Sequence, residues 1–137
     1  MTHPTTTNQV IAREVALTHD AARSWLQDHG WQTLATRGQF QLFADVVRRR
    51  PFVMGRIWHT AATLALEGLN ESFDDDAFIA VIGIDGRQTI RTGTHSVDLL
   101  PGQLYIQPFN QRLEVDAQEP VARLVFISEW SRLSGGS

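Results

Sequence analysis

Residues 78–92 read FIAVIGIDGRQTIRT, and this stretch decides the class of fold. An apolar run is followed by the dipeptide Asp85-Gly86 and then by a segment in which polar and apolar residues alternate. A short apolar run suits a strand covered on both faces, and alternation suits a half-buried strand. Because Asp-Gly between two such runs is a strong hairpin signal, the stretch predicts two antiparallel strands joined by a tight turn.

The same alternation of short strand-like segments and turns continues over most of the chain. The expected strands are residues 32–36, 39–47, 52–60, 63–69, 77–83, 88–92, 96–100, 104–107, 112–116 and 121–127. Before them, Thr18 or Asp20 as N-cap and Gly30 as the C-terminal stop predict one helix. We therefore expect a mainly β antiparallel sandwich or barrel with one N-terminal α-helix. Residues 18–132 are the expected domain, and residues 1–17 and 133–137 are expected to be flexible tails.

Composition excludes several classes of function. The 137 residues contain no Cys, and all twelve basic residues are Arg, which removes thiol nucleophiles, zinc thiolates, Schiff-base lysines and the P-loop lysine. A net charge of −3 argues against direct binding of nucleic acid by this chain. No apolar run approaches the length of a membrane span, and the N-terminus has no signal-peptide pattern, so we expect a cytoplasmic protein with no membrane partner.

The region around the turn at residues 101–102 carries a family resemblance. Gly102 and Pro108 are separated by five residues, Asn110 follows at the second position after the proline, and Leu113 comes three residues later. This spacing resembles the second signature of the cupin superfamily, which has Gly at the position of Asn110 and a metal-binding His at the position of Leu113. The resemblance implies a double-stranded β-helix, the cupin sandwich. Since the His-x-His pair of the first cupin signature is also missing upstream of Gly83, we expect a barrel without metal or other cofactor.

Within the superfamily, the chain is more similar to the N-terminal ligand-binding domain of AraC-type transcription regulators. The features that carry this likeness are Trp25 in the N-terminal helix, the strand pair within residues 39–60, and the sequence LLPGQL at residues 99–104. The resemblance implies a small organic ligand in the barrel and a homodimer. Such regulators continue into two helix-turn-helix motifs, whereas this chain stops after Ser134-Gly135-Gly136-Ser137, so it is either an excised sensor domain or a free-standing relative.

Strand alternation indicates which side chains face the interior. His59 shares the parity of Val53 and Ile57, and His95 shares that of Val97 and Leu99, so both histidines are expected to face inward. Further inward rows are expected at Gln88 with Ile90, at Leu104 with Ile106, and at Leu113 with Val115. Trp58 and Tyr105 fall on the opposite parity and could belong to the core, to a dimer surface or to a pocket wall.

Two functions remain open at this point. The first is a metal-free small-molecule-binding domain with candidate ligand contacts at His59, Gln88, His95, Trp58 and Tyr105. The alternative is a free-standing, metal-independent cupin enzyme (an isomerase, cyclase or lyase) acting on an apolar molecule, with His59 and His95 as acid and base. For each histidine, a hydrogen-bonded packing role is the competing interpretation. Trp25, Trp31, Trp58 and Tyr105 include candidates for a surface covered by a second copy.

Overall fold

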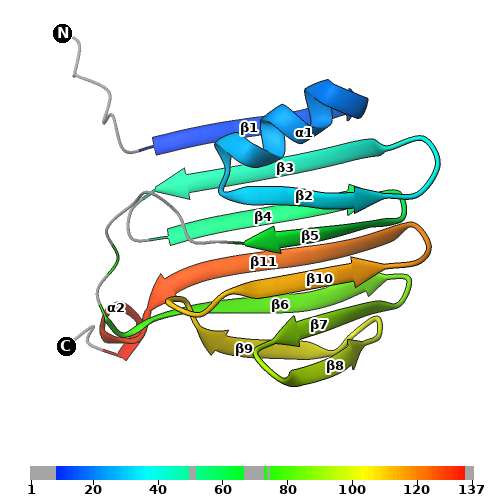
Figure 1. Cartoon of the computed structure of the whole chain (residues 1–137). Helices are drawn as coiled ribbons and strands as arrows, with labels where there is room; N and C mark the ends of the chain where they lie inside the picture. Colours follow the sequence, from blue (N-terminus) through cyan, green and yellow to red (C-terminus); the bar gives the residue numbers. More distant parts are fainter. Residues whose placement is uncertain (1–8, 50–51, 67–72, 74, 135–137) are drawn as a thin grey trace, which may run out of the picture.

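The computed structural model describes residues 9–49, 52–66, 73 and 75–134, which form two packed antiparallel sheets (Figure 1). The six-stranded sheet has, in spatial order, β1 (Gln9–Thr18), β3 (Gln41–Arg49), β4 (Phe52–His59), β11 (Val121–Glu129), β6 (Ala77–Asp85) and β9 (Leu104–Pro108). The five-stranded sheet has β2 (Trp31–Thr36), β5 (Ala62–Leu66), β10 (Leu113–Ala117), β7 (Gln88–Thr92) and β8 (His95–Leu99). The predicted mainly β sandwich is confirmed. Among the described residues, no helix is long and apolar enough to cross a membrane.

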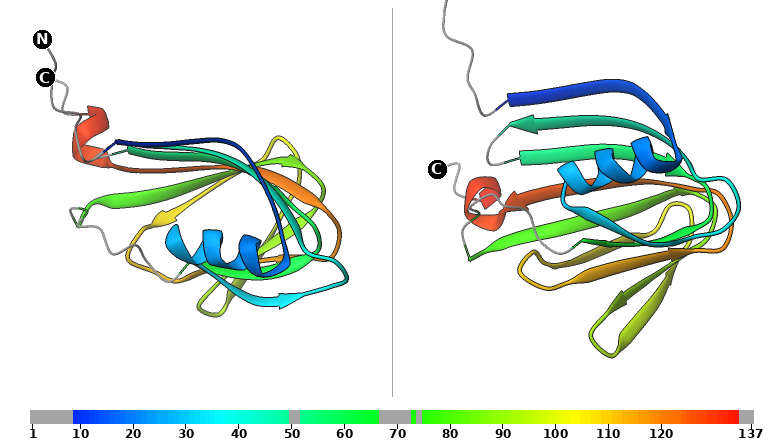
Figure 2. Two further views of the ribbon diagram at one scale, coloured as in Figure 1. Left: turned by 90° about the horizontal axis from the view of Figure 1, so that it is seen from above. Right: turned by 45° about the horizontal axis from the view of Figure 1, so that its top comes forward.

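Two helices complete the domain. Helix α1 (His19–Asp28) lies beside β2 and covers the edge of the sandwich next to β1 and β3 (Figures 1 and 2). Its buried residues Ala22 and Leu26 join the core. Helix α2 (Trp130–Ser134) follows β11 directly, and the ring of Trp130 stacks on that of Phe78 with 4.1 Å between centroids.

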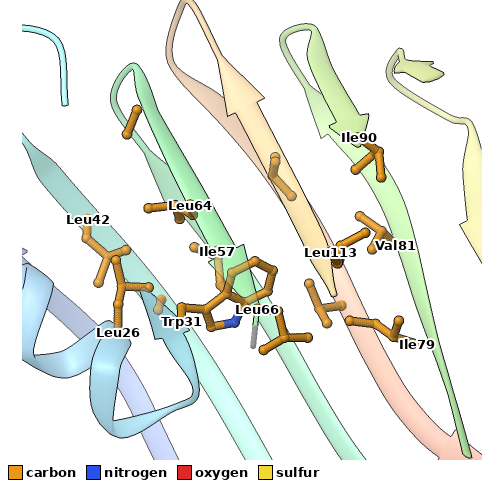
Figure 3. Close-up of a cluster of buried hydrophobic side chains, with 14 of the residues drawn as sticks. Leu26, Trp31, Leu42, Ile57, Leu64, Leu66, Ile79, Val81, Ile90 and Leu113 are labelled. Atoms are coloured by element: carbon orange, nitrogen blue, oxygen red, sulfur yellow. The ribbon is translucent and has the colours of Figure 1, made fainter. Parts of the chain in front are cut away.

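The core fills the space between the sheets and is made of inward-facing residues from both. Figure 3 shows Ile57, Ile79 and Val81 of the six-stranded sheet facing Leu64 and Leu113 of the other. A strand with one buried face contributes every second side chain to such a layer. The expected inward positions of Ile90, Leu113 and Val115 are confirmed, since all three are buried.

Parts of the two expected tails belong to regular elements in the structure. Residues 9–17 belong to β1, which pairs with β3, and residues 133–134 belong to α2. The alternation along β1 is interrupted by an irregularity in its register between Ala12 and Val15, where Glu14 has a φ of 54° and its N–H donates to Asp45 Oδ1 at 2.8 Å. A bulge of this kind shifts the strand's side chains between faces, so the period-two signal disappears.

The turn at Asp85-Gly86 is also different from the prediction. It connects β6 in one sheet to β7 in the other, so the two flanking strands are not paired with each other. Gly86 has a φ of +75°, and a Cβ added there would lie 2.5 Å from the carbonyl oxygen of Pro120. The dipeptide correctly indicates a tight turn. Because β11 and β9 pair with the two edges of β6, β7 cannot pair with β6, and the turn crosses to the other sheet.

The expected orientation of β9 is wrong. Leu104 and Ile106 are 57% and 43% exposed on the outer face, whereas Gln107 is buried and Tyr105 is packed against the core. The strand does alternate, but its apolar row of Leu104 and Ile106 lies on the outer face, and the row of Tyr105 and Gln107 faces inward. The outer face of the six-stranded sheet is itself apolar, which removes the usual contrast between core and solvent.

Candidate ligand-binding site

A buried polar cluster joins the two sheets inside the barrel. His59 on β4, Gln88 on β7 and Arg123 on β11 are all fully buried. Arg123 Nη1 lies 2.9 Å from His59 Nε2 and 3.2 Å from Gln88 Oε1. The guanidinium therefore bridges a residue of its own sheet and a residue of the opposite sheet, and we call these three residues the Arg123 cluster.

The hydrogen bonds define the protonation state of His59. Its Nδ1 lies 2.6 Å from the carbonyl oxygen of Thr60, which can only accept, so Nδ1 carries the proton. Nε2 then presents its lone pair to Arg123, which can only donate. Burial, with the charge of Arg123 as the second cause, lowers the pKa of His59 to about 3. The imidazole is thus neutral, with both ring nitrogens engaged.

The side-chain amide of Gln88 is oriented by two hydrogen bonds, one that it donates and one that it accepts. Its Nε2 donates to the carbonyl oxygen of Ala122 at 3.3 Å, and its Oε1 accepts from Arg123. The amide can accept from the guanidinium only in this orientation. The predicted inward orientation of Gln88 and His59 is confirmed by their burial.

Arg123 was not among the candidates from the sequence, although it is the largest fully buried side chain. It shares the parity of Val121, Val125 and Ile127, all of which are buried. A charged residue in an inward row of a central strand was the available signal. It was hidden because Ala122 and the apolar residues that alternate with this row make β11 apolar on both parities.

A cavity of about 30 Å³ lies at the mouth of the barrel next to this cluster. Its walls are mostly apolar and come from α1 and from β2, β3, β4, β5 and β11. Trp25, Trp31, Ile57 and Val125 are among them, and His29 and Arg48 are the polar members. The Trp31 ring belongs to both features, because the guanidinium carbon of Arg123 lies 5.3 Å from its centroid. An apolar, partly enclosed space with a few polar groups beside it is the usual character of a small-molecule site.

The other candidate residues do not join the cluster. His95 pairs with Thr92 and so lies on the same face of the sheet as Ile90, as expected. It is nevertheless exposed, because β8 is an edge strand and this end of it is uncovered. Trp58 faces outward and packs on Phe43 with 5.2 Å between ring centroids. Tyr105 is half-buried against the core and donates to Gln107 Oε1 at 2.7 Å, and burial raises the pKa of its phenol.

The comparisons with known proteins place the architecture in a fold family. No protein-family model and no curated protein matches the chain. Among solved structures, the cupin domain of an XRE family transcriptional regulator from Enterobacter cloacae matches with a TM-score of 0.52 at 14% identity, covering 64% of this chain and 95% of that one. The chain has the cupin fold. A cupin superfamily protein from Desulfitobacterium hafniense matches with a TM-score of 0.53 at 10% identity, covering 65% and 77%. The cupin domain of Cnp3 from Schizosaccharomyces pombe matches with 0.52 at 9%, covering 69% and 65%.

The cupin barrel of this chain is not built to hold a metal ion at the position of the family's signature. Leu113, where the second signature has His, is fully buried in the apolar core. Within the described part of the chain, no group of three or more His, Cys, Asp or Glu could hold a metal ion. Inside the barrel, a cation would also meet the charge of Arg123 in a low-dielectric surrounding, which is unfavourable. The residues present do not fit a metal, and we derive no chemistry through one.

The neutral, buried His59 leads to a pH dependence of stability. Unfolded His59 takes up a proton near its ordinary pKa of 6.5, whereas the folded pKa is about 3. The unfolded chain therefore binds more protons between these values, and the free energy of unfolding should fall by up to about 1.4 kcal/mol per pH unit as the pH decreases below 6.5. We expect a loss of about 2 kcal/mol between pH 6.5 and 5 from this group.

Urea unfolding of wild type, His59→Gln and His95→Gln at pH 6.5 and 5 measures this effect. The glutamine at position 59 keeps an acceptor for Arg123 but removes the titration, so its stability should change less between the two pH values. The exposed His95 serves as the control, and its variant should behave like the wild type. An equal loss in the His59→Gln variant contradicts the assignment.

Proposed function

We propose that this chain is a small-molecule-binding cupin domain that works without a metal. The observation that carries the proposal is the cavity at the barrel mouth, which is walled mostly by apolar side chains and shares the Trp31 ring with the buried Arg123 cluster. The polar cluster joins strands of both sheets. A ligand that disturbs it is therefore coupled mechanically to both layers of the sandwich.

A sensor role is the finer form of this proposal. The sequence resembles the ligand-binding domain of AraC-type regulators, and one similar solved structure is a cupin domain of an XRE family regulator. In such an arrangement the ligand acts by favouring one state of the domain over another, which is a linkage effect and needs no chemical step. The enzyme alternative relied on His59 and His95 as an acid–base pair, and no observation favours that pair: both ring nitrogens of His59 are bonded, and His95 is exposed.

The proposal is tested by binding of small aromatic probes with the cavity open and with it filled. Gly55 lines the cavity, and a Cβ added there would lie 3.4 Å from Val46 Cγ2, so a leucine at this position occupies the space. We expect benzoate, or its neutral analogues benzamide and benzyl alcohol, to bind the wild type saturably in calorimetry. The Gly55→Leu variant should lose this binding while keeping its circular dichroism spectrum. Absence of binding by all three probes, or equal binding by the folded variant, contradicts the proposal.

We further propose that the domain forms a homodimer through the outer face of the six-stranded sheet. Eight large apolar residues on its strands are between 37% and 57% exposed, namely Ile11, Phe43, Val47, Phe52, Met54, Ile84, Leu104 and Ile106. A contiguous apolar face of this kind is typical of an interaction surface. Arg56 and Asp45 on this face form an ion pair with each other, so two copies can meet here without an unpaired charge at that position. A second copy offers the same surface for a two-fold contact.

Replacing Met54 by Asp should convert the protein to a monomer. Met54 lies within this face, 45% exposed, beside Val47 and Phe126 in register, and a charge there costs desolvation in a dimer but little in a monomer. Light scattering should give about twice 15.4 kDa for the wild type and 15.4 kDa for the variant. Val97→Asp, at a similarly exposed position on the other sheet, should stay dimeric. A wild-type protein that is monomeric at high micromolar concentration contradicts this part of the proposal.

A further inference from the structure

Arg123 is a buried cation with no carboxylate partner among the described residues. Its side chain is completely buried, and the hydrogen bonds of Nη1 go to two neutral acceptors, His59 Nε2 and Gln88 Oε1. The other two nitrogens, Nε and Nη2, are buried without a hydrogen-bond partner in the described part of the chain. Burying a charge in this way costs several kcal/mol, and proteins ordinarily offset that cost with an anion.

The two unbonded nitrogens form one edge of the guanidinium. In an arginine side chain the Nε–H and one Nη2–H bond point in the same direction, and a carboxylate accepts both in a bidentate pair. His59 and Gln88 occupy the remaining end through Nη1, so they hold the plane of the group and leave this edge open for a partner. The geometry is that of a prepared carboxylate receptor, with its orientation fixed by neighbours.

Arg123 does not itself line the cavity at the barrel mouth, but its neighbours in the sheet and the ring packed on its guanidinium do. Arg123 pairs in the sheet with Ile57, and its near neighbour Val125 pairs with Gly55; these three neighbours all line the cavity. Trp31 lies over the guanidinium and is also a wall of the cavity. A volume of about 30 Å³ holds only about two water molecules. A larger ligand can therefore reach Arg123 only if the Trp31 ring moves aside.

We propose that the ligand of this barrel is an organic monocarboxylate with an apolar body, whose carboxylate pairs with Nε and Nη2 of Arg123 and whose body occupies the mouth in contact with Trp25 and Trp31. This inference rests on the proposed binding function and specifies its ligand class. The Nε and Nη2 edge of Arg123 offers two parallel N–H groups and one positive charge, which match a carboxylate, whereas a phosphate dianion brings a second charge and further acceptor oxygens to that edge. The displacement of Trp31 makes binding visible in tryptophan fluorescence.

The test compares benzoate with benzamide, which has nearly the same shape but no charge, and with inorganic phosphate, all at matched ionic strength. For the wild type we expect benzoate to bind at least 10-fold more tightly than benzamide, with a change in tryptophan fluorescence, and phosphate to bind no more tightly than benzamide. In the Arg123→Gln variant benzoate should lose at least 10-fold in affinity and approach benzamide. Arg56→Gln, at an exposed arginine on the outer face, should retain the wild-type preference.

The outcomes separate this inference from the proposed function. If benzoate, benzamide and benzyl alcohol all fail to bind, both proposals fail. If benzamide binds as tightly as benzoate, the binding function stands and the carboxylate assignment is overturned. Tighter binding of phosphate than of benzoate also overturns it. Should Arg123→Gln not fold, Arg123→Lys keeps the charge but lacks the parallel N–H pair, and benzoate affinity should fall while benzamide affinity is unchanged. Unchanged benzoate affinity in a folded Arg123 variant contradicts the proposal.

Discussion

The ligand-free Arg123→Met variant is expected to be more stable than the wild type by about 1–3 kcal/mol. Methionine fills much of the same space without a charge, so the cost of keeping an uncompensated guanidinium in the core disappears. The change leaves His59 Nε2 and Gln88 Oε1 without their charged donor, a loss of about 1–3 kcal/mol for each buried acceptor. The desolvation cost of the charge is larger than the loss of these two hydrogen bonds, so the variant should gain stability. This is the behaviour expected of a residue that is kept for binding at the expense of stability.

Urea unfolding at pH 7 without ligand measures this difference. Arg23→Met, which removes an exposed arginine that donates to Thr36 Oγ1 at 3.1 Å, should change the free energy of unfolding by no more than about 0.5 kcal/mol. A loss of about 3–5 kcal/mol in Arg123→Met is the behaviour of a broken structural ion pair. That outcome would show that the charge of Arg123 is already compensated within the chain and would remove the reason for an anionic ligand.

Replacing Gly83 by Ala is expected to cost about 3 kcal/mol of stability. A Cβ at this position would lie 2.5 Å from the carbonyl oxygen of Leu100. The turn cannot move away easily, because Gly83 N–H donates to the carbonyl oxygen of Gln103 and Gly102 N–H donates to that of Gly83. The clash is therefore with fixed backbone and is not relieved by a side-chain rotation.

Gly55→Ala on β4 of the same sheet is the matched control. Its added Cβ would meet Val46 Cγ2 at 3.4 Å, an ordinary contact with a side chain. Chemical unfolding of both variants should show a large loss only for Gly83→Ala. If the two variants unfold at the same denaturant concentration as the wild type, the close approach of the turn to β6 is not a constraint on this fold.

The order of most strands could be predicted from alternation and turn residues, because these depend on local chemistry. Thus β7 spans Gln88–Thr92 as expected, and His59 faces inward with Ile57 as their shared parity indicates. Strand β1 could not be found in the same way, since its bulge at Glu14 shifts the pattern between faces. Which strands pair with each other is a nonlocal property. Asp85-Gly86 therefore predicted a turn but did not reveal that the strands on its two sides belong to different sheets.

The candidate site shows the same difference between what local sequence reveals and what depends on nonlocal contacts. Gln88 and His59 were recognisable as polar residues in inward rows, but their common partner Arg123 is 64 residues from His59 in the sequence. Nothing local shows that the three side chains meet across two sheets. On β9 the inward residue is Tyr105 and not Leu104, because the outer face is also apolar. On β11 alternation carries no information because both parities are apolar, whereas β9 alternates but has its apolar row on the outer face.

The most direct measurement of the central claim is the NMR signal of the Arg123 Nε–H group in protein prepared with isotope-labelled arginine. The signal is identified by its absence in Arg123→Met and followed as benzoate is added, with benzamide added to a parallel sample. The account predicts that benzoate shifts the Arg123 signal saturably, as expected when a free N–H acquires a charged acceptor, and that benzamide leaves it nearly unchanged. A saturable response of the protein to benzoate in which the Arg123 Nε–H signal does not move would contradict the account.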